Sequence, residues 1–401
     1  ELIVIKMEPL SIKQKEMLVE KWDKKGFKVS SISNKNTAMN TAILLENEYN
    51  EVILKEGESV TTDIVDFKKI VMPLVRRIMP TLIANDLVAV QPMSAPVGLA
   101  YSWKYKYGTT TAGGATAGDE MGYNTVHQGY TGQSTVTPAS GASGVSTGAG
   151  ELFGTGGSNS EILDSGFFMD MVTVTAKTRK IKAGWSLEAM QDLQAMHGLD
   201  IEAEMTNILQ YEIAAELDRE IINTIHSLTT LANGNKETFT LADSDGRWQG
   251  ERFRTLYTAI VKEAQKIAIN TRMQAGNFLL CSPDVVTALM SLNNFLMSPV
   301  STSPMDLGVG VAKVGEIDGL FSVYRDTFAT SNYVTVGLKG ADVARAGIIY
   351  SPYVPVLITK AVNPTSFHPV IGVMSRYGIT SHLLGAKNYY RRLDVNFTGV
   401  L

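Results

Sequence analysis

The segment with the most recognisable chemistry is residues 144–148, G-V-S-T-G, which match the G-x-S-x-G nucleophile motif. That motif activates its serine on a sharp turn between a strand and a helix, with a histidine and an acid close by. Here the segment stands in a tract of Gly, Ser and Ala, with no strand pattern before it and no helix pattern after it. A chance match is the favoured interpretation, and a serine hydrolase that uses Ser146 stays an alternative.

The other reactive side chains lack the spacing that metal or cofactor chemistry requires. No H-E-x-x-H occurs, no two histidines stand at i, i+4, and no G-x-x-x-x-G-K-[ST] phosphate loop is present. Cys281 ends the apolar run 278–281, which indicates a buried, inert thiol in a strand. We therefore predict no catalytic residue, no metal site and no cofactor; the histidines are scattered as His127, His197, His226, His368 and His382.

Charge and composition narrow the class of protein further. The 401 residues include 36 Lys and Arg against 40 Asp and Glu, a net charge of −4. Nucleic-acid readers usually have a basic excess, so this balance disfavours them and leaves only non-specific contact with DNA. No apolar run approaches the ~20 residues that cross a bilayer. A single cysteine fits a reducing cytoplasm. A soluble enzyme and a structural protein remain.

A glycine-rich tract separates two strand patterns in the middle of the chain. Residues 108–166 contain fifteen of the 35 glycines, and no Lys or Arg stands between Lys106 and Lys177. The flanking runs 99–107 and 169–177 alternate as strands do, the first with Tyr and Trp at its odd positions. The pattern predicts a long projecting hairpin or loop that neighbouring subunits order. A polymer-binding module with strand 101–107 as its platform is a second alternative.

The chain that must support this loop has a helical pattern between the loop and residue 230, and an α/β pattern after residue 230. Asp200 can cap a helix whose apolar residues recur at every fourth position from Ile201 to Ile225, so we expect a spine of roughly 40 Å. Residues 1–70 read as short helical pieces of an arm. A helix over 253–267 and strands over 278–281, 321–325, 333–338 and 347–350 indicate an α/β lobe.

Two arginine pairs are embedded among apolar or aromatic residues, Arg76-Arg77 and Arg391-Arg392. A guanidinium group in such surroundings usually binds a carboxylate with two hydrogen bonds. The carboxylate can belong to the same chain or to a neighbouring subunit, and the residues alone leave both possibilities open.

Several stretches resemble the major capsid protein of T-even-like tailed bacteriophages. Residues 76–93, RRIMPTLIANDLVAVQPM, are similar to the family's RR-x-x-P-x-L-I-A-x-D and V-Q-P-M run. Residues 186–200 resemble its S-I-E-L-A-Q-D-L and H-G-x-D segment. Shorter matches follow in order to the C-terminal end, at 212–220, 247–253, 276–278, 350–354, 376–378 and 390–392.

The resemblance implies an α+β chain with the HK97-type capsid fold: an N-terminal arm, an extended loop, a peripheral domain with a long spine helix, and an axial α/β domain. It implies the following division: 1–70 for the arm, 71–107 for the start of the peripheral domain and the first loop strand, 108–177 for the extended loop, 178–235 for the peripheral domain with the spine helix, 236–360 for the axial domain and 361–401 for the return strands of the peripheral domain.

By the same resemblance, the protein is a structural subunit and not an enzyme. Copies would self-assemble in the host cytoplasm into hexameric and pentameric capsomers of an icosahedral or prolate head that encloses the DNA genome. Vertex, portal, scaffolding, protease and decoration proteins of the phage are the implied partners. The residues expected at contacts between subunits are Arg76, Arg77, Trp103, Arg376, Tyr377, Arg391 and Arg392.

Overall fold

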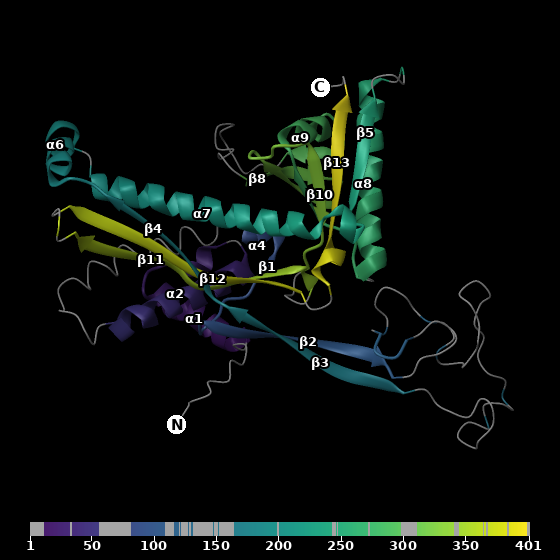
Figure 1. Cartoon of the computed structure of the whole chain (residues 1–401), viewed down its shortest axis with the longest axis horizontal. Coiled ribbons are helices and arrows are strands. Elements are labelled where there is room, and N and C mark those ends of the chain that lie inside the picture. Colours follow the sequence, from purple (N-terminus) through teal and green to yellow (C-terminus); the bar gives the residue numbers. More distant parts are fainter. Residues whose placement is uncertain are drawn as a thin grey trace.

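The computed structural model consists of two lobes joined by a long helix, with a hairpin that projects from one of them (Figure 1). Arg76, Arg77 and Ser146 lie outside the described residues. No helix in the described ranges is long and apolar enough to cross a membrane. The described residues are 12–32, 34–55, 82–108, 116–119, 164–198, 200–242, 248–271, 273–297, 311–340, 345–363, 368–382 and 385–398, with positions 121, 127, 130, 147, 151, 246 and 365.

Two N-terminal helices, α1 and α2, pack on each other and on the first lobe. Trp22 of α1 is 1% exposed and lies edge-on to Phe27. The prediction of short, loosely connected pieces is wrong here, because α2 has 21 residues and its Leu44 and Leu45 belong to the main core. The bounds are α1 (Ile12–Lys24), η1 (Val29–Ser31) and α2 (Lys35–Lys55).

The first lobe contains a four-stranded sheet with the order β1-β11-β12-β4. The helix α7 contacts β12 and β4, and α2 contacts β11 on the opposite side of the sheet (Figure 1). β1 is parallel to β11, and the other pairs are antiparallel. The bounds are α4 (Ala84–Leu87), β1 (Ala89–Val90), β4 (Lys177–Gly184), β11 (Ile348–Val362) and β12 (Pro369–Ser381).

The helix α7 (Ile201–Leu228) is the predicted spine, with 28 residues and a length of about 42 Å. The Asp200 side chain caps it by accepting a hydrogen bond from the Glu202 amide at 3.0 Å. The predicted apolar stripe is buried in the C-terminal two thirds of the helix. The shorter helix α6 (Leu187–His197) precedes α7 and has no buried residue. The buried apolar residues of α7 are Leu209, Ile213, Leu217, Ile221, Ile222 and Ile225.

The second lobe is an α/β layer on a seven-stranded sheet with the order β5-β13-β10-β6-β9-β8-β7. The strand at 278–281 is fully buried, as predicted, and α8 covers the sheet through its contacts with β13 and β10. Strands β5 and β8 were not foreseen from the sequence patterns. The bounds are η3 (Leu231–Asn233), β5 (Lys236–Ala242), α8 (Gln249–Thr271), β6 (Phe278–Cys281), α9 (Pro283–Met290), β7 (Phe295–Met297), β8 (Val311–Ile317), β9 (Phe321–Asp326), β10 (Tyr333–Gly337), η7 (Ala386–Tyr389) and β13 (Tyr390–Thr398).

The pairing of the last strands differs from the expected division at residue 360. β11 begins within the range expected for the axial domain, but it pairs with β12 in the four-stranded sheet. β13, expected among the peripheral return strands, lies between β5 and β10 in the seven-stranded sheet. The sequence pattern of a buried strand indicates a strand, but it does not indicate which sheet the strand joins.

The predicted hairpin is formed by β2 (Val97–Tyr107) and β3 (Ser165–Thr175), which pair antiparallel over their full lengths. It extends away from both lobes (Figure 1). The tract between the two strands is described only at residues 108, 116–119, 121, 127, 130, 147, 151 and 164.

A buried ion pair ties β13 to α8 inside the second lobe. The Arg391 Nε atom lies 2.5 Å from Glu263 Oε2, and the two side chains are only 8% and 2% exposed. A second guanidinium nitrogen donates to the Gly234 carbonyl oxygen at 3.1 Å. The same arginine therefore also holds the turn that follows α7, and its carboxylate partner is within its own chain.

We predict that Arg391→Ala lowers the free energy of unfolding by about 2–3 kcal/mol, because it removes the buried charged hydrogen bonds to Glu263 and Gly234 and leaves Lys266 as the cation that pairs with the Glu263 carboxylate. Arg392→Ala should cost less than about 1 kcal/mol, since Arg392 pairs with Asp394 near the surface. Urea unfolding of the monomeric chain measures both values. Equal losses for the two variants would contradict the assignment of Arg391 as a buried structural residue.

A buried carboxylate links α7 to the start of α4. Asp218 accepts a hydrogen bond from the Ile83 amide at 3.2 Å, and no cation is among the groups that perturb it. Burial raises the pKa of Asp218 to about 7, although the Ile83 hydrogen bond partly opposes the shift. The ring of Tyr350, which is fully buried, lies within electrostatic range of this carboxylate. The folded chain thus favours the protonated acid.

This shift has a defined effect on stability. The unfolded chain releases the Asp218 proton near pH 4 and the folded chain near pH 7, so the free energy of unfolding falls as pH rises through that window. Asp218→Asn keeps an acceptor for Ile83 and removes the titration. Between pH 5 and pH 7 the native chain should lose about 2–3 kcal/mol more than the variant, at about 1.4 kcal/mol per pH unit. The free energy of unfolding of both chains is measured by urea unfolding at each pH. Equal changes with pH in the two chains would refute the prediction.

Candidate functional site

The most exposed apolar surface in the described part of the hairpin is one face near its outer end. Opposed residues of an antiparallel pair share a face, and Tyr105 is paired with Phe167 in the register. The rings of these two residues lie 5.8 Å apart. We call Tyr105, Phe167, Met169 and Met171 the apolar strip; their side chains are 59%, 52%, 56% and 64% exposed.

The aromatic strand only partly follows the prediction of one covered and one wet face. Tyr107 is 4% exposed and packs against Tyr130, with ring centroids 4.5 Å apart. Tyr105, two residues earlier, is exposed in the single chain. Within the described residues of this chain, most of the Tyr105 side chain therefore stays in solvent. Trp103 lies on the same strand, paired with Met169 in the backbone register.

The base of the hairpin is held tightly where the chain enters the four-stranded sheet. β3 continues into β4 through Ala176, whose amide donates to the Pro96 carbonyl oxygen at 2.9 Å. Gly378 of β12 allows this close approach, because a Cβ atom there would lie 2.5 Å from a methyl carbon of Val174. The Asn47 side chain of α2 donates to the Met93 carbonyl oxygen at 2.7 Å, just before β2 begins. The hairpin therefore leaves a well-packed base.

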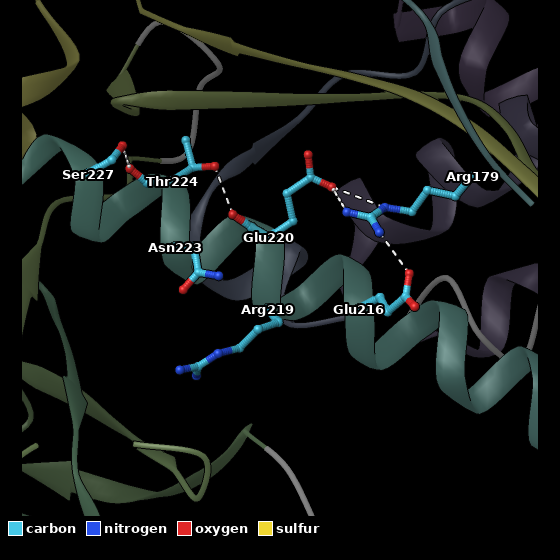
Figure 2. Close-up of a pocket in the computed structure, with 7 residues that line it drawn as sticks. All are labelled: Arg179, Glu216, Arg219, Glu220, Asn223, Thr224 and Ser227. Carbon is cyan, nitrogen blue, oxygen red and sulfur yellow. Dashed lines mark hydrogen bonds and ion pairs between the residues drawn. The ribbon is translucent and has the colours of Figure 1, made fainter. Parts of the chain in front are cut away.

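A polar groove of about 500 Å³ runs along α7 above this base (Figure 2). Arg179 of β4 reaches α7 and binds Glu216 at 2.7 Å and Glu220 at 2.5 Å. The Tyr377 hydroxyl of β12 accepts from Arg179 and donates to Glu220. Arg219, on another side of the helix, pairs with the buried Asp326 of the second lobe at 2.7 Å. The helix is thus tied to both lobes by charged hydrogen bonds.

The ionisation states in this cluster favour a permanent ion pair. Burial alone would raise the pKa of Glu220, but hydrogen bonds from Tyr377 and Arg179 outweigh it and hold the pKa below its ordinary value. The hydrogen bond with Glu220 raises the pKa of Arg179. Burial raises the pKa of Tyr377 to about 12, and the bond to Glu220 adds to the shift. Near neutral pH, Arg179 and Glu220 therefore stay charged and Tyr377 stays neutral, as a structural clamp requires.

The described residues predicted to contact neighbouring subunits have these positions within the chain. Arg376 stacks over the Tyr353 ring, 5.1 Å from its centroid, and Tyr377 belongs to the α7 cluster. Arg392 stacks over Tyr333 at 4.7 Å and binds Asp394 at 2.6 Å. Arg391 pairs with Glu263 of its own chain, which is one of the two kinds of partner that the sequence left open. Contact with another subunit stays a prediction for the other described residues, and Arg76 and Arg77 fall outside the described part.

The groups with potential chemistry are not assembled into a reactive site in the described ranges. No cluster of three or more His, Cys, Asp or Glu side chains that could hold a metal is found there. Cys281 is completely buried, and burial raises the pKa of its thiol. His226 lies edge-on to the Tyr333 ring, and burial lowers the pKa of His226 to about 4. The Ser146 motif lies outside the described residues, so the structure places no partners around it.

Sequence reasoning did not find the Arg179 clamp or the apolar residues at 167–171. The signal for the clamp was available in the basic residues of 177–182, K-T-R-K-I-K. In a strand these residues divide between the two faces, with 177 and 179 on one face and 180 and 182 on the other. The acidic partners of the clamp at 216 and 220 are one helical turn apart and therefore share a face of α7. Only the position of β4 beside α7 shows that the two patterns meet.

Comparison with known proteins gives a consistent result. A family model described as Major capsid protein Gp23 matches residues 64–395. The major capsid protein of Vibrio phage KVP40 is 31% identical, with 86% of this chain and 82% of the relative covered. That of Enterobacteria phage T4 is 30% identical, covering 83% and 78%. A capsid vertex protein of the same Vibrio phage is 31% identical over 54% of this chain and 68% of its own length.

Solved phage structures align over most of the chain at low identity. A chain from Mycobacterium phage Bobi aligns with a TM-score of 0.48 and 10% identity, covering 79% of this chain and 90% of that one. The capsid of Myoviridae phage XM1 aligns with a TM-score of 0.43 and 9% identity, covering 77% and 89%. The assignment of the chain to a family therefore rests on the sequence match and on the share of the chain that this match covers.

The described elements have the α+β architecture expected of the HK97-type fold, with a hairpin, a long helix beside a sheet and an α/β lobe. The family model spans most of the chain, and relatives 30–31% identical are covered over 78–82% of their length. The chain therefore belongs to the Gp23 family of major capsid proteins, the structural subunits of tailed-phage capsids.

Proposed function

We propose that this chain is the repeating subunit of an icosahedral or prolate head, and that its hairpin binds a neighbouring copy through the apolar strip. Assembly takes place in the host cytoplasm and produces hexameric capsomers, with pentamers at the vertices. The single observation that supports this best is the apolar strip itself, four side chains that are each more than half exposed on a projecting hairpin.

The physical argument is that a hairpin of this kind is incomplete alone. A two-stranded ribbon has no second layer, so an apolar face on it remains in water unless another surface covers it. A closed shell of identical subunits supplies such a surface once per copy, because each contact is repeated around a ring. The glycine-rich tract with little apolar content fits a segment that orders on assembly.

The domain roles follow from this arrangement. The lobe with α7, the four-stranded sheet and the N-terminal helices takes the peripheral role, and the seven-stranded lobe surrounds the capsomer axis. β13 belongs to the axial lobe by its pairing, and β11 to the peripheral one. Arg376 and Arg392, whose partners within the chain are aromatic rings or surface acids, remain candidates for contacts between subunits.

Further partners are proposed by analogy with the relatives. The match to a capsid vertex protein supports a related chain as a partner at the vertices. Portal, scaffolding, protease and decoration proteins are proposed as further partners because the resemblance to the capsid family implies them. Contact with packaged DNA is non-specific, in agreement with the net charge of −4.

Deleting residues 112–160 should leave a folded, soluble monomer but abolish closed particles, because the segment lies beyond the paired strands of the hairpin. Velocity sedimentation measures the distribution between monomer and shell, and negative-stain micrographs show whether shells are closed. Circular dichroism of the deleted chain checks that the two lobes fold. Normal particles from the deleted chain would contradict the proposed role of the loop.

The apolar strip can be tested without a deletion. Phe167→Ser with Met171→Ser should reduce particle yield at least about tenfold, since buried apolar contacts are the main source of association energy. The stability of the monomer should change by less than about 1 kcal/mol because both side chains are exposed. Phe168→Ser, on the opposite face of the same strand, is the matched control. Equal yields from both variants would show that the strip is not the contact surface.

A further inference from the structure

The short helix α4 is held by two groups that come from different parts of the fold. Asp218 of α7 accepts a hydrogen bond from the Ile83 amide, at the start of α4, at 3.2 Å. The Lys339 ammonium group, which follows β10 of the second lobe, donates to the Asn85 carbonyl oxygen within α4. Figure 1 shows α4 beside α7, near the junction with the second lobe. α4 is therefore a connection between the lobes in addition to α7 itself.

Lys339 reaches α4 from a fixed position in the second lobe. Its amide donates to Asn277 Oδ1 at 2.9 Å, and its carbonyl oxygen accepts from Asn277 Nδ2 at 2.6 Å. Asn277 directly precedes β6, which is completely buried. Burial lowers the pKa of Lys339, and the nearby Asp86 carboxylate of α4 partly opposes the shift. The second lobe thus holds α4 through a cation that is itself anchored by two hydrogen bonds.

The hold from α7 depends on a carboxyl group that lacks a cationic partner in the described part of the chain. Neither Lys nor Arg is among the groups that shift the pKa of Asp218. Its neighbours on α7, Arg219 and Glu220, are engaged in the ion pairs described above. From α4 the Ile83 amide contacts the carboxyl group, and from β11 the Tyr350 ring lies within electrostatic range. Burial therefore dominates and raises the pKa of Asp218 to about 7.

Tyr350 gives independent evidence that this site suits an uncharged acid. Its side chain is 1% exposed, and its hydroxyl group forms no hydrogen bond within the described part of the chain. The ring of Tyr377 of β12 lies 5.7 Å away, but its hydroxyl group already donates to Glu220. Among the described groups, a charged Asp218 would thus keep a single hydrogen bond, from an amide. A buried charge with so little compensation is costly.

Ionisation of Asp218 is relieved when α4 moves away from α7 and water enters. An aspartate in water releases its proton near pH 4, and the closed site releases it near pH 7. The equilibrium constant for opening therefore rises about tenfold for each pH unit between these values and levels off above pH 7. α4 has only four residues, so we expect it to open as one unit and to leave Lys339 in the same step.

We propose that α4 is a pH-sensitive joint between the two lobes. With Asp218 protonated, α4 is closed between α7 and Lys339, and the lobes keep one orientation. With Asp218 ionised, α4 opens, and α7 with its Arg219–Asp326 ion pair remains as a more mobile connection. The joint acts within one chain, so it does not depend on the proposed contact of the hairpin.

Two other accounts of the same residues predict different behaviour. In the first, the titration of Asp218 lowers only the stability of the whole chain, and α4 opens no earlier than the rest of the fold. In the second, the Tyr350 hydroxyl group turns to the carboxylate and neutralises it in place. The joint is favoured because short segments open at lower free energy than central strands, and because each polar hold on α4 is a single hydrogen bond.

The first test compares the opening of α4 with the opening of the whole chain by hydrogen exchange. Rates are measured at pH 5 and pH 7 in the native chain and in Asp218→Asn, and each is corrected for the intrinsic rate at that pH. The amides of residues 85–88 bond to carbonyl oxygens of residues 82–84 and report on α4. Those of residues 278–281, in the middle of the seven-stranded sheet, report on global unfolding.

In the native chain at pH 7, the α4 amides should exchange at least about tenfold faster than the amides of 278–281. Between pH 5 and pH 7, the opening of α4 should rise at least about tenfold. In Asp218→Asn the same rise should be less than about threefold, because the variant keeps an acceptor for Ile83 and has no proton to lose.

A second variant tests the hold from the other lobe. Lys339→Met keeps most of the aliphatic side chain and removes the ammonium group that binds Asn85. It should raise the opening of α4 at least about fivefold at pH 5, where the hold from Asp218 is intact. Glu212→Gln removes an exposed acid of α7 and is the matched control, which should behave like the native chain. Circular dichroism confirms that each variant folds.

The orientation of the lobes is measured with spin labels. Lys182→Cys and Lys262→Cys place the labels at exposed positions of the first and the second lobe. The native Cys281 is completely buried, so the label does not reach it. The distribution of distances between the labels should broaden from pH 5 to pH 7, and it should stay unchanged when Asp218→Asn is added.

Three results would overturn the inference. Equal exchange of the amides of 85–88 and 278–281 would show that α4 opens only with the whole chain. Opening of native α4 that does not change between pH 5 and pH 7 would mean that the carboxylate is neutralised in place. An unchanged distance between the labels in the native chain would show that α4 does not set the orientation of the lobes. These measurements use the unassembled chain, so their outcome is separate from that of the assembly experiments.

Discussion

A two-stranded ribbon can satisfy its hydrogen bonds along one edge only, and it has no core of its own. In this chain such a ribbon extends for eleven residue pairs and exposes an apolar strip near its outer end. The free energy of leaving that strip in water, at ~25 cal/mol per Å² of apolar surface, favours any arrangement that covers it. The other main features of the fold hold the ribbon in a defined direction.

That direction is set at the base of the ribbon and transmitted through α7. β3 passes into β4 with a single intervening residue, so the hairpin cannot swing without moving the edge of the sheet. Arg179 on that edge is bound to Glu216 and Glu220, and Arg219 ties the same helix to Asp326 of the second lobe. The clamp is made of charged hydrogen bonds, which are stronger and more directional than neutral ones. The helix thereby connects the ribbon to both lobes.

Charge is distributed by layers in the first lobe. The acids of α7 neutralise the bases on one face of the sheet, and the other face keeps its positive charge. The net charge of −4 does not show this division between the two faces.

Local features of the chain were determined by the sequence alone. The caps at Ser186 and Asp200, the apolar stripe of α7 and the alternating strands of the hairpin all depend on residues a few positions apart, and the structure confirms them. The family could also be identified from residue spacing, because its motifs are contiguous. What only the tertiary structure decided depends on pairs far apart in the chain: β13 joins β5 and not β12, Arg391 binds Glu263, and Lys180 and Arg179 face opposite sides. Such pairs are selected by packing and burial of the whole chain, for which the local pattern contains no separate signal.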